Sequence, residues 1–153
     1  MKLKTKNFGE IEIDESKLIM FEKGIIGYPE FNQFALIHDE EQGDNAGIRW
    51  LQSIEEPGFA LPVMDPLVIK DGYNPKVDDE LLKPLHLDNT DDMLVLVTVT
   101  VPKDIKKLSV NLCGPIVINA EKRLGVQVIV ENDEYPVRFP VYELLKNKKE
   151  AGE

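Results

Sequence analysis

The sequence predicts an all-β protein, a small antiparallel β-barrel-like or sandwich domain with one or two short helices. Short apolar runs recur along most of the chain, and several of them alternate strictly with polar residues. Ten prolines and ten glycines are dispersed between these runs, as turn residues between short strands of a sandwich or barrel would be. With 153 residues, one domain is expected over residues 1–147, followed by a tail at 148–153 that should fray.

Five short strands are predicted in the first half of the chain. Residues 10–13 read Glu-Ile-Glu-Ile, which is the alternation expected of a half-buried strand. Apolar runs at residues 18–21, 34–37, 48–53 and 59–63 predict four more, and the turn-like Glu56-Pro57-Gly58 separates the last two.

The strongest predicted strand covers residues 93–101. Its odd positions are all apolar, and its even positions mix leucine with threonine. This pattern predicts a central strand with one fully buried face. Further strands are predicted at residues 108–112, 116–119 and 124–130, with a turn at 113–115.

Two short helices are predicted. Asp78, Asp79 and Glu80 precede two leucines, and acidic residues are favoured at a helix N-terminus. Pro84 should end this helix after one or two turns. The second helix is predicted at residues 141–146, after Pro140 and with lysine in its last turn.

The charge is strongly acidic and unevenly distributed. The net charge is −10, and residues 39–56 and 71–92 each carry a net −5. Because phosphate contacts dominate affinity for nucleic acids, we expect no direct binding of RNA or DNA. The acidic segments are either a solubilising surface or a surface that attracts a basic partner. Asp39, Glu40, Glu41 and Asp44 are the candidate residues for that partner.

No catalytic, cofactor-binding or metal-binding residue is predicted. No serine lies in a nucleophile elbow, and the single cysteine, Cys113, has no histidine near it in the sequence. Phosphate-binding glycine loops and metal-ligand spacings are absent from the sequence. A lone cysteine fits a reducing compartment, and the lack of a membrane-length apolar run and of a secretory h-region predicts a chain that neither crosses a bilayer nor carries a secretory signal.

Two apolar clusters lie in segments that should be loops. In residues 21–31 the candidate partner-binding residues are Ile25, Tyr28 and Phe31, because aromatic residues often anchor interfaces. The alternative is that this segment folds back over the open end of a barrel. Residues 135–140 form the second cluster, for which two prolines favour an extended segment at the edge of the sheet.

Five motifs, in order along essentially the whole chain, resemble the flagellar assembly factor FliW family. They are Phe-Glu-Lys-Gly-Ile-Ile-Gly-Tyr at 21–28, Trp-Leu-Gln-Ser at 50–53, Asn-Leu-Cys-Gly-Pro-Ile-Val-Ile-Asn at 111–119, Gly-x-Gln-x-Ile at 125–129 and Tyr-Pro-Val-Arg at 135–138. Each motif alone is modest, but five in order are specific.

The resemblance implies a cytoplasmic, non-enzymatic protein with a β-barrel-like fold. It also implies that the protein binds flagellin before export, and that it binds the translational repressor CsrA and relieves its repression of flagellin synthesis. FliW could cover the RNA groove of CsrA or bind elsewhere, and the resemblance favours the second, non-competitive mode. The alternative function is a small β-barrel hydrolase that uses clustered carboxylates, which would need a deep polar pocket and carboxyl groups of perturbed pKa.

Overall fold

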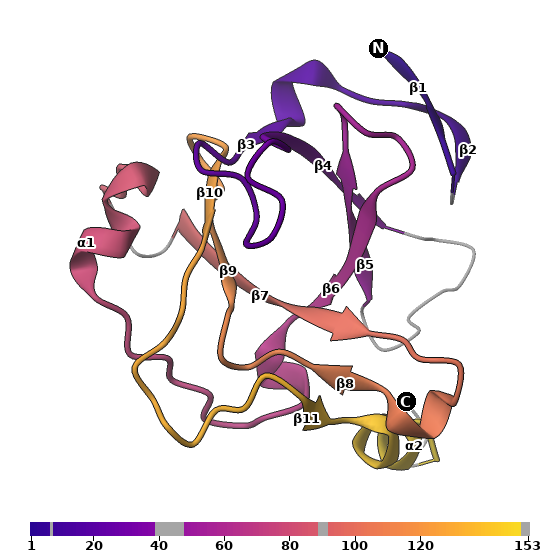
Figure 1. Ribbon diagram of the computed structural model, residues 1–153, viewed down its shortest axis with the longest axis vertical. Helices are drawn as coiled ribbons and strands as arrows, with labels where there is room; N and C mark the ends of the chain where they lie inside the picture. The colour runs from indigo at the N-terminus through magenta and orange to yellow at the C-terminus, as the bar shows by residue number, and fades with distance from the viewer. Residues whose placement is uncertain (7, 39–47, 89–91, 151–153) are drawn as a thin grey trace.

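Seven strands close into a β-barrel in the computed structural model, which describes residues 1–6, 8–38, 48–88 and 92–150 (Figure 1). Neighbouring strands are hydrogen-bonded in the order β3-β4-β5-β6-β7-β9-β10, and β10 pairs with β3 to close the barrel. The barrel strands are β3 (Ile19–Met20), β4 (Gln33–His38), β5 (Arg49–Ser53), β6 (Ala60–Met64), β7 (Met93–Thr100), β9 (Ile116–Asn119) and β10 (Leu124–Gln127).

The barrel is antiparallel at every pairing described except one. Between β10 and β3 the strands run parallel, and a single residue pair, Leu124 with Met20, is in register. By contrast, five residue pairs join β4 to β5. The predicted fold class is confirmed, and the closed pairing selects the barrel rather than the sandwich.

Four further strands extend this barrel or lie beside it. Strands β1 (Lys2–Thr5) and β2 (Gly9–Glu12) form a separate antiparallel hairpin at the N-terminus. Strands β8 (Ser109–Val110) and β11 (Phe139–Pro140) continue the sheet outward from β7, and β11 is its outermost strand. The predicted extended segment at the sheet edge is therefore present at the end of residues 135–140.

The helices are short and cover the outside of the barrel. They are α1 (Asp79–Leu82), α2 (Tyr142–Glu150) and the 3-10 helices η1 (Glu15–Lys17), η3 (Pro66–Val68), η4 (Lys83–Leu85) and η6 (Ile105–Lys107). Asp78 caps α1 by accepting a hydrogen bond from the Glu80 amide at 3.0 Å. As predicted, α1 does not continue past Pro84, which lies in η4. Helix α2 extends four residues beyond Lys146, where the sequence predicted its end.

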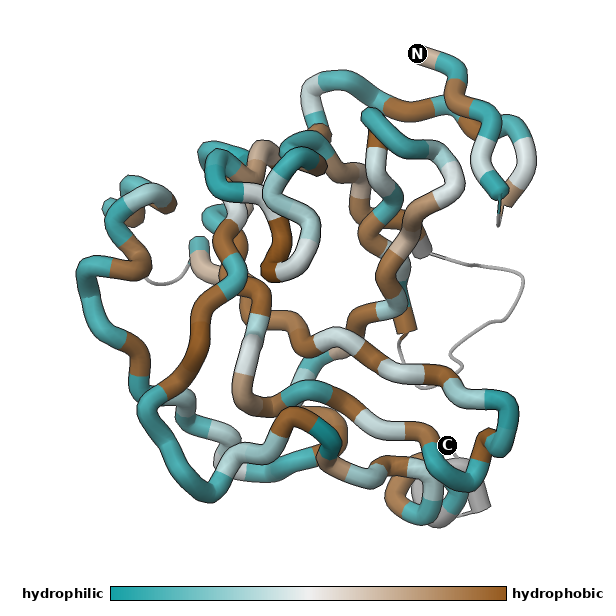
Figure 2. Tube along the Cα trace, viewed as in Figure 1, coloured by the Kyte–Doolittle hydropathy of each residue, from teal (hydrophilic) through white to brown (hydrophobic). Residues whose placement is uncertain are grey.

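Strand β7 differs from its prediction because both of its faces are buried at its centre. Leu96 lies in the barrel interior with residues of β3, β4, β5, β6 and β9. Val97 and Val99 point the other way, into a cluster outside the barrel. The odd positions, which the sequence predicted to form the buried face, point into this outer cluster, and they are buried only in the second half of the strand, since Met93 is 36% exposed. The even positions face the barrel interior through Leu96. Figure 2 shows the hydrophobic residues gathered along these central strands.

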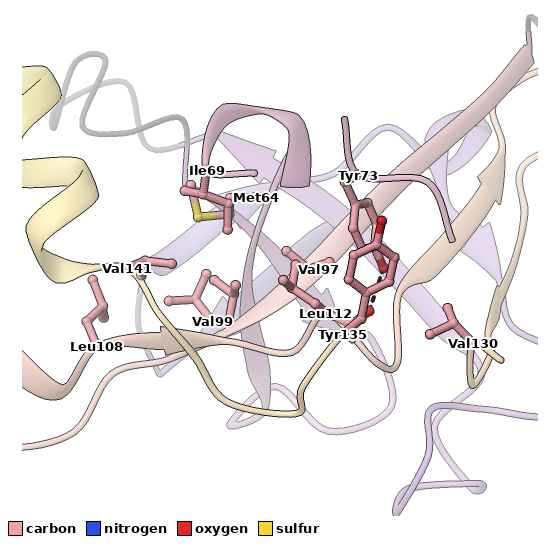
Figure 3. Packing of buried hydrophobic residues seen from close by; sticks show 11 residues of the cluster. Met64, Ile69, Tyr73, Val97, Val99, Leu108, Leu112, Val130, Tyr135 and Val141 are labelled. Carbon is pink, nitrogen blue, oxygen red and sulfur yellow. Dashed lines mark hydrogen bonds between the residues drawn. The ribbon is translucent and has the colours of Figure 1, made fainter. Parts of the chain in front are cut away.

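The outer cluster lies between β7, β8 and α2. Tyr73 and Tyr135 pack against each other there, with ring centroids 4.6 Å apart, and the Tyr73 hydroxyl donates a 2.6 Å hydrogen bond to the Leu112 carbonyl (Figure 3). Burial raises the pKa of Tyr73 well above its usual range. The buried members of this cluster are Met64, Ile69, Tyr73, Val97, Val99, Leu108, Val110, Leu112, Val130, Tyr135 and Val141.

Candidate partner-binding surfaces

The segment between β3 and β4 closes one end of the barrel. Phe21 and Ile25 lie in the barrel interior, where Phe21 packs edge-on against Phe34 with ring centroids 5.3 Å apart. Figure 1 shows the segment curling across the barrel opening. The alternative interpretation of this apolar stretch, a loop folded back over the barrel end, is therefore correct for its buried residues.

Backbone and side-chain hydrogen bonds hold this loop in place. Ile25 and Tyr28 pair through two backbone hydrogen bonds of 3.3 and 2.7 Å, so the chain reverses at Ile26 and Gly27. The Ile26 amide donates to Gln127 Oε1 at 2.9 Å, which fastens the turn to strand β10. Gln127 also donates from Nε2 to the Gly114 carbonyl at 2.9 Å. The loop is thus attached to the barrel wall.

Two glycines have backbone conformations that this loop requires. Gly24 has φ +69° and Gly27 has φ +92°, a region that other L-residues rarely adopt. A Cβ atom on Gly24 would lie 2.6 Å from the Tyr28 carbonyl oxygen and 2.6 Å from the Pro29 Cα. The close backbone approach at Gly24 is what places Tyr28 and Pro29 over the barrel end.

Three partly exposed aromatic rings form what we call the aromatic surface: Tyr28, Phe31 and Phe59. Tyr28 stacks on Phe31 with centroids 5.7 Å apart and contacts Phe59 at 4.5 Å. Phe59 in turn lies 6.4 Å from the buried Phe34, so the surface continues into the barrel core. Tyr28 is 41% exposed, which leaves much of its side chain available for contact with a partner.

The structure corrects one of the apolar candidates and adds another. Ile25 was predicted to lie on a docking patch, but it is 3% exposed because its side chain enters the barrel interior. Phe59 was assigned only to a strand, yet its ring lies between Tyr28 and Phe31 on one side and Phe34 on the other. Its position directly after the Glu56-Pro57-Gly58 turn was the one signal in the sequence that could have placed it at the barrel end.

The structure describes most acidic residues of the second acidic segment, but not the four candidate residues of the first. Asp39, Glu40, Glu41 and Asp44 lie outside the described residues, and so does Asp91. In the second segment, Asp71, Asp78, Asp79, Glu80 and Asp88 are all exposed. Two of these carboxylates have ion pairs, Glu80 with Lys83 at 2.8 Å and Asp88 with Lys122 at 3.0 Å. The described part of this segment is a solvated acidic surface around α1.

One acidic contact near this segment depends on protonation. Hydrogen bonding to Asp92, together with the negative charge of Asp92, raises the pKa of the Glu121 carboxyl above its usual value of 4.5. The nearby charge of Lys122 acts in the opposite direction. Because Glu121 is exposed, solvent weakens these interactions.

We expect Glu121→Gln to be more stable than the unmodified protein at neutral pH. A carboxyl group with a raised folded-state pKa stabilises the fold below its unfolded pKa, and that stability is lost as pH rises through the folded pKa. The glutamine keeps a hydrogen-bonding group beside Asp92 but never ionises. Chemical denaturation between pH 4 and pH 8 measures the difference, with Glu10→Gln on the separate β1–β2 hairpin as the control. Equal pH profiles for the unmodified protein and Glu121→Gln would contradict the expectation.

The groups considered for catalysis do not come together. Cys113 is partly exposed and packs against the outer cluster near Tyr73. His86 lies after η4, beside a hollow of about 360 Å³ that is also lined by Asp79, Leu82, Lys83 and Leu87. Among the described residues, no group of three or more metal-ligating side chains is present. The carboxyl group with a raised pKa, Glu121, is exposed and does not line this hollow, whereas a hydrolase would need such groups in a deep polar pocket.

Comparison with known proteins identifies the family. The sequence model of a family described as "FliW protein" matches residues 2–141. The chain belongs to the FliW family. It is 47% identical over 150 residues to the flagellar assembly factor FliW of Lachnospira eligens, covering 97% of this chain and 99% of that protein. The FliW of Caldanaerobacter subterraneus is 43% identical over 147 residues, covering 96% and 97%.

A solved structure agrees with this assignment. The crystal structure of a flagellar assembly factor FliW superposes with a TM-score of 0.83 at 34% sequence identity, and the match covers 92% of this chain and 96% of the other. The FliW resemblance seen in the five motifs is therefore confirmed. Within the residues that the structure describes, neither helix has the length and hydrophobicity to cross a bilayer.

Proposed function

We propose that this FliW protein is a cytoplasmic, non-enzymatic flagellar assembly factor that binds flagellin and, separately, the translational repressor CsrA. Binding of CsrA relieves its repression of flagellin mRNA translation, so that the amount of free flagellin controls the synthesis of more. Membership of the FliW family supports the assignment to flagellar assembly, and relatives at 47% and 43% identity are named as flagellar assembly factors.

The aromatic surface carries the flagellin part of the proposal. Tyr28 and Phe31 are stacked at the barrel end on a loop that two hydrogen-bonded turns and Gln127 hold in place. Rings that are fixed before binding lose little conformational freedom when a partner docks, which favours their use as anchors. An amphipathic helix of flagellin would lay its apolar side on this surface.

The acidic surfaces support the CsrA part of the proposal. An RNA-binding protein presents basic groups, and the net charge of −10 on this chain attracts them. Complementary exposed charges mainly raise the rate of association, and salt screens them beyond about 8 Å at physiological ionic strength. The non-competitive mode, in which FliW binds CsrA away from its RNA groove, is the one that the resemblance to the family favours.

Neutralising Asp39, Glu40, Glu41 and Asp44 together should slow association with CsrA and flatten its dependence on salt. The long-range attraction that steers the two proteins together is lost, while short-range contacts remain. Stopped-flow measurements at low and high salt give both association rates. Neutralising Asp71, Asp79, Glu80 and Asp88 instead is the matched variant, since it removes the same charge from the other acidic segment. If the unmodified protein associates with CsrA equally fast at both salt concentrations, the proposal that charge steers the association is wrong.

A pull-down from a lysate of the source cell tests the proposed function. The tagged full chain should recover flagellin and CsrA, and size-exclusion chromatography of the eluate should separate them into distinct complexes. Adding purified flagellin should then release CsrA. Recovery of neither protein would contradict the proposal, and so would recovery of CsrA that added flagellin does not displace.

A further inference from the structure

One end of this acidic protein is basic. Six cationic residues, which we call the cationic surface, lie on η6, β11, α2 and the loops beside them: Lys70, Lys103, Lys106, Lys107, Arg138 and Lys146. Figure 1 shows the loop that joins β7 to β8, which contains η6, beside α2. Helix α2 contacts η6, and β11 pairs with β8 at Pro140 and Ser109.

The cations of the cationic surface make no ion pair with a described carboxylate, although hydrogen bonding and, to a smaller extent, the charge of Lys70 lower the pKa of Glu134. By contrast, Lys83 and Lys122 of the acidic side are both in ion pairs. The acidic residues on or next to these elements include Asp71, Asp104, Glu143 and Glu150. Asp104 accepts a hydrogen bond from the Lys106 amide at 3.1 Å, which caps η6. The six cations outnumber these acidic residues, although the overall charge of the chain is −10.

Exposed aliphatic side chains lie among these cations. Ile105 on η6 is 49% exposed and Leu144 on α2 is 38% exposed, and the two elements are in contact. Val101, just before η6, is 55% exposed. The neighbours of these residues point inward, since Leu108, Val141 and Leu145 pack into the outer cluster. The surface therefore offers apolar contact area and unpaired positive charge together, as protein-binding surfaces do.

We propose that the cationic surface docks an acidic, amphipathic segment of a partner protein. Aliphatic side chains suit a protein partner better than a single-stranded nucleic acid, which proteins hold chiefly by stacking bases on aromatic rings. Of the aromatic residues on these elements, Phe139 is already covered by Lys70, whose Nζ lies 5.7 Å from its centroid, and Tyr142 packs against the outer cluster. An anionic bilayer would present its extended negative surface to the acidic remainder of the protein as well, whereas a short acidic segment would not.

This inference rests on the proposed function, because it assigns the segment to flagellin. CsrA binds RNA and must present basic groups, which the cationic surface repels. Flagellin is the remaining partner. It would therefore contact two separate surfaces of the chain, aromatic at the barrel end and cationic at η6 and α2.

Charge reversal with a matched control tests the proposal. Lys106→Glu/Lys107→Glu changes the net charge by the same amount as Lys2→Glu/Lys4→Glu on the exposed β1 strand of the N-terminal hairpin. Calorimetric titration with flagellin at low salt should show a loss of affinity of roughly tenfold for the first variant and little change for the second. Ile105→Ser, which keeps the charge, should also weaken binding.

The outcomes separate the two proposals. If the unmodified chain does not bind flagellin, the proposed function fails and this inference fails with it. If it binds flagellin and both charge-reversal variants bind equally well, only the cationic surface is wrong. Binding of the unmodified chain to phosphatidylserine vesicles, lost in Lys106→Glu/Lys107→Glu while flagellin binding stays unchanged, would also overturn the proposal in favour of a membrane.

Discussion

Gly24→Ala is expected to lower the free energy of unfolding by about 2–5 kcal/mol. The left-handed backbone conformation costs a non-glycine residue about 1–2 kcal/mol, and forcing atoms into a packed region costs about 1–3 kcal/mol more. At Gly24 the new Cβ would lie 2.6 Å from backbone atoms of Tyr28 and Pro29, which cannot rotate away as a flexible side chain would. Equilibrium unfolding in urea measures the loss.

Gly27→Ala is the matched control for this prediction. It lies in the same loop and also has a positive φ, but a Cβ there would meet no atom within 4 Å. Its cost should be limited to the backbone term of about 1–2 kcal/mol. Equal losses for Gly24→Ala and Gly27→Ala would show that the close approach to Tyr28 and Pro29 has no energetic importance.

Tyr28→Ala is expected to weaken flagellin binding roughly thirtyfold. Aromatic anchors commonly cost about 2 kcal/mol or more when truncated, which corresponds to that change in affinity. The effect on folding should be smaller, because Tyr28 is partly exposed and packs mainly against Phe31 and Phe59 rather than in the barrel interior. We therefore expect a melting temperature only a few degrees lower, measured on the same sample as the affinity.

Leu67→Ala serves as the control for the aromatic surface. Leu67 is a large exposed apolar residue on η3, away from the loop at residues 21–31, so its truncation removes similar hydrophobic area without touching Tyr28. A stable Tyr28→Ala protein that binds flagellin as tightly as Leu67→Ala would remove the aromatic surface from the proposal. A large drop in melting temperature would instead assign Tyr28 to packing of the barrel end.

The strands were predictable where alternation was strong, and less so where tertiary contacts define them. The apolar run at residues 93–101 and the short run at 116–119 correspond closely to β7 and β9. By contrast, β11 consists of two residues and exists because β8 lies beside it. Periodicity marked the odd positions of β7 as buried, but it could not reveal that they face the outer cluster while the even position Leu96 faces the barrel interior.

The aromatic surface was predictable only in part, for a related reason. The sequence placed Tyr28 and Phe31 in a glycine-rich loop, and both contribute to the surface. It did not separate them from Ile25, because which side of a loop enters the core depends on the turn geometry at Gly24 and Gly27. Phe59 joins the group through contacts across the barrel end, and the cationic surface likewise combines residues from three separate stretches of the chain.

The single pair that closes the barrel has a consequence for how the protein folds. Met20 and Leu124 lie about a hundred residues apart along the chain, and the entropy lost in bringing chain ends together grows with their separation. The hairpin of β4 and β5 and the hairpin of β9 and β10 each form from nearby residues and should fold first. The joint between β3 and β10 should then form late and open early, so amide protons there should exchange with solvent faster than those along β4 and β5.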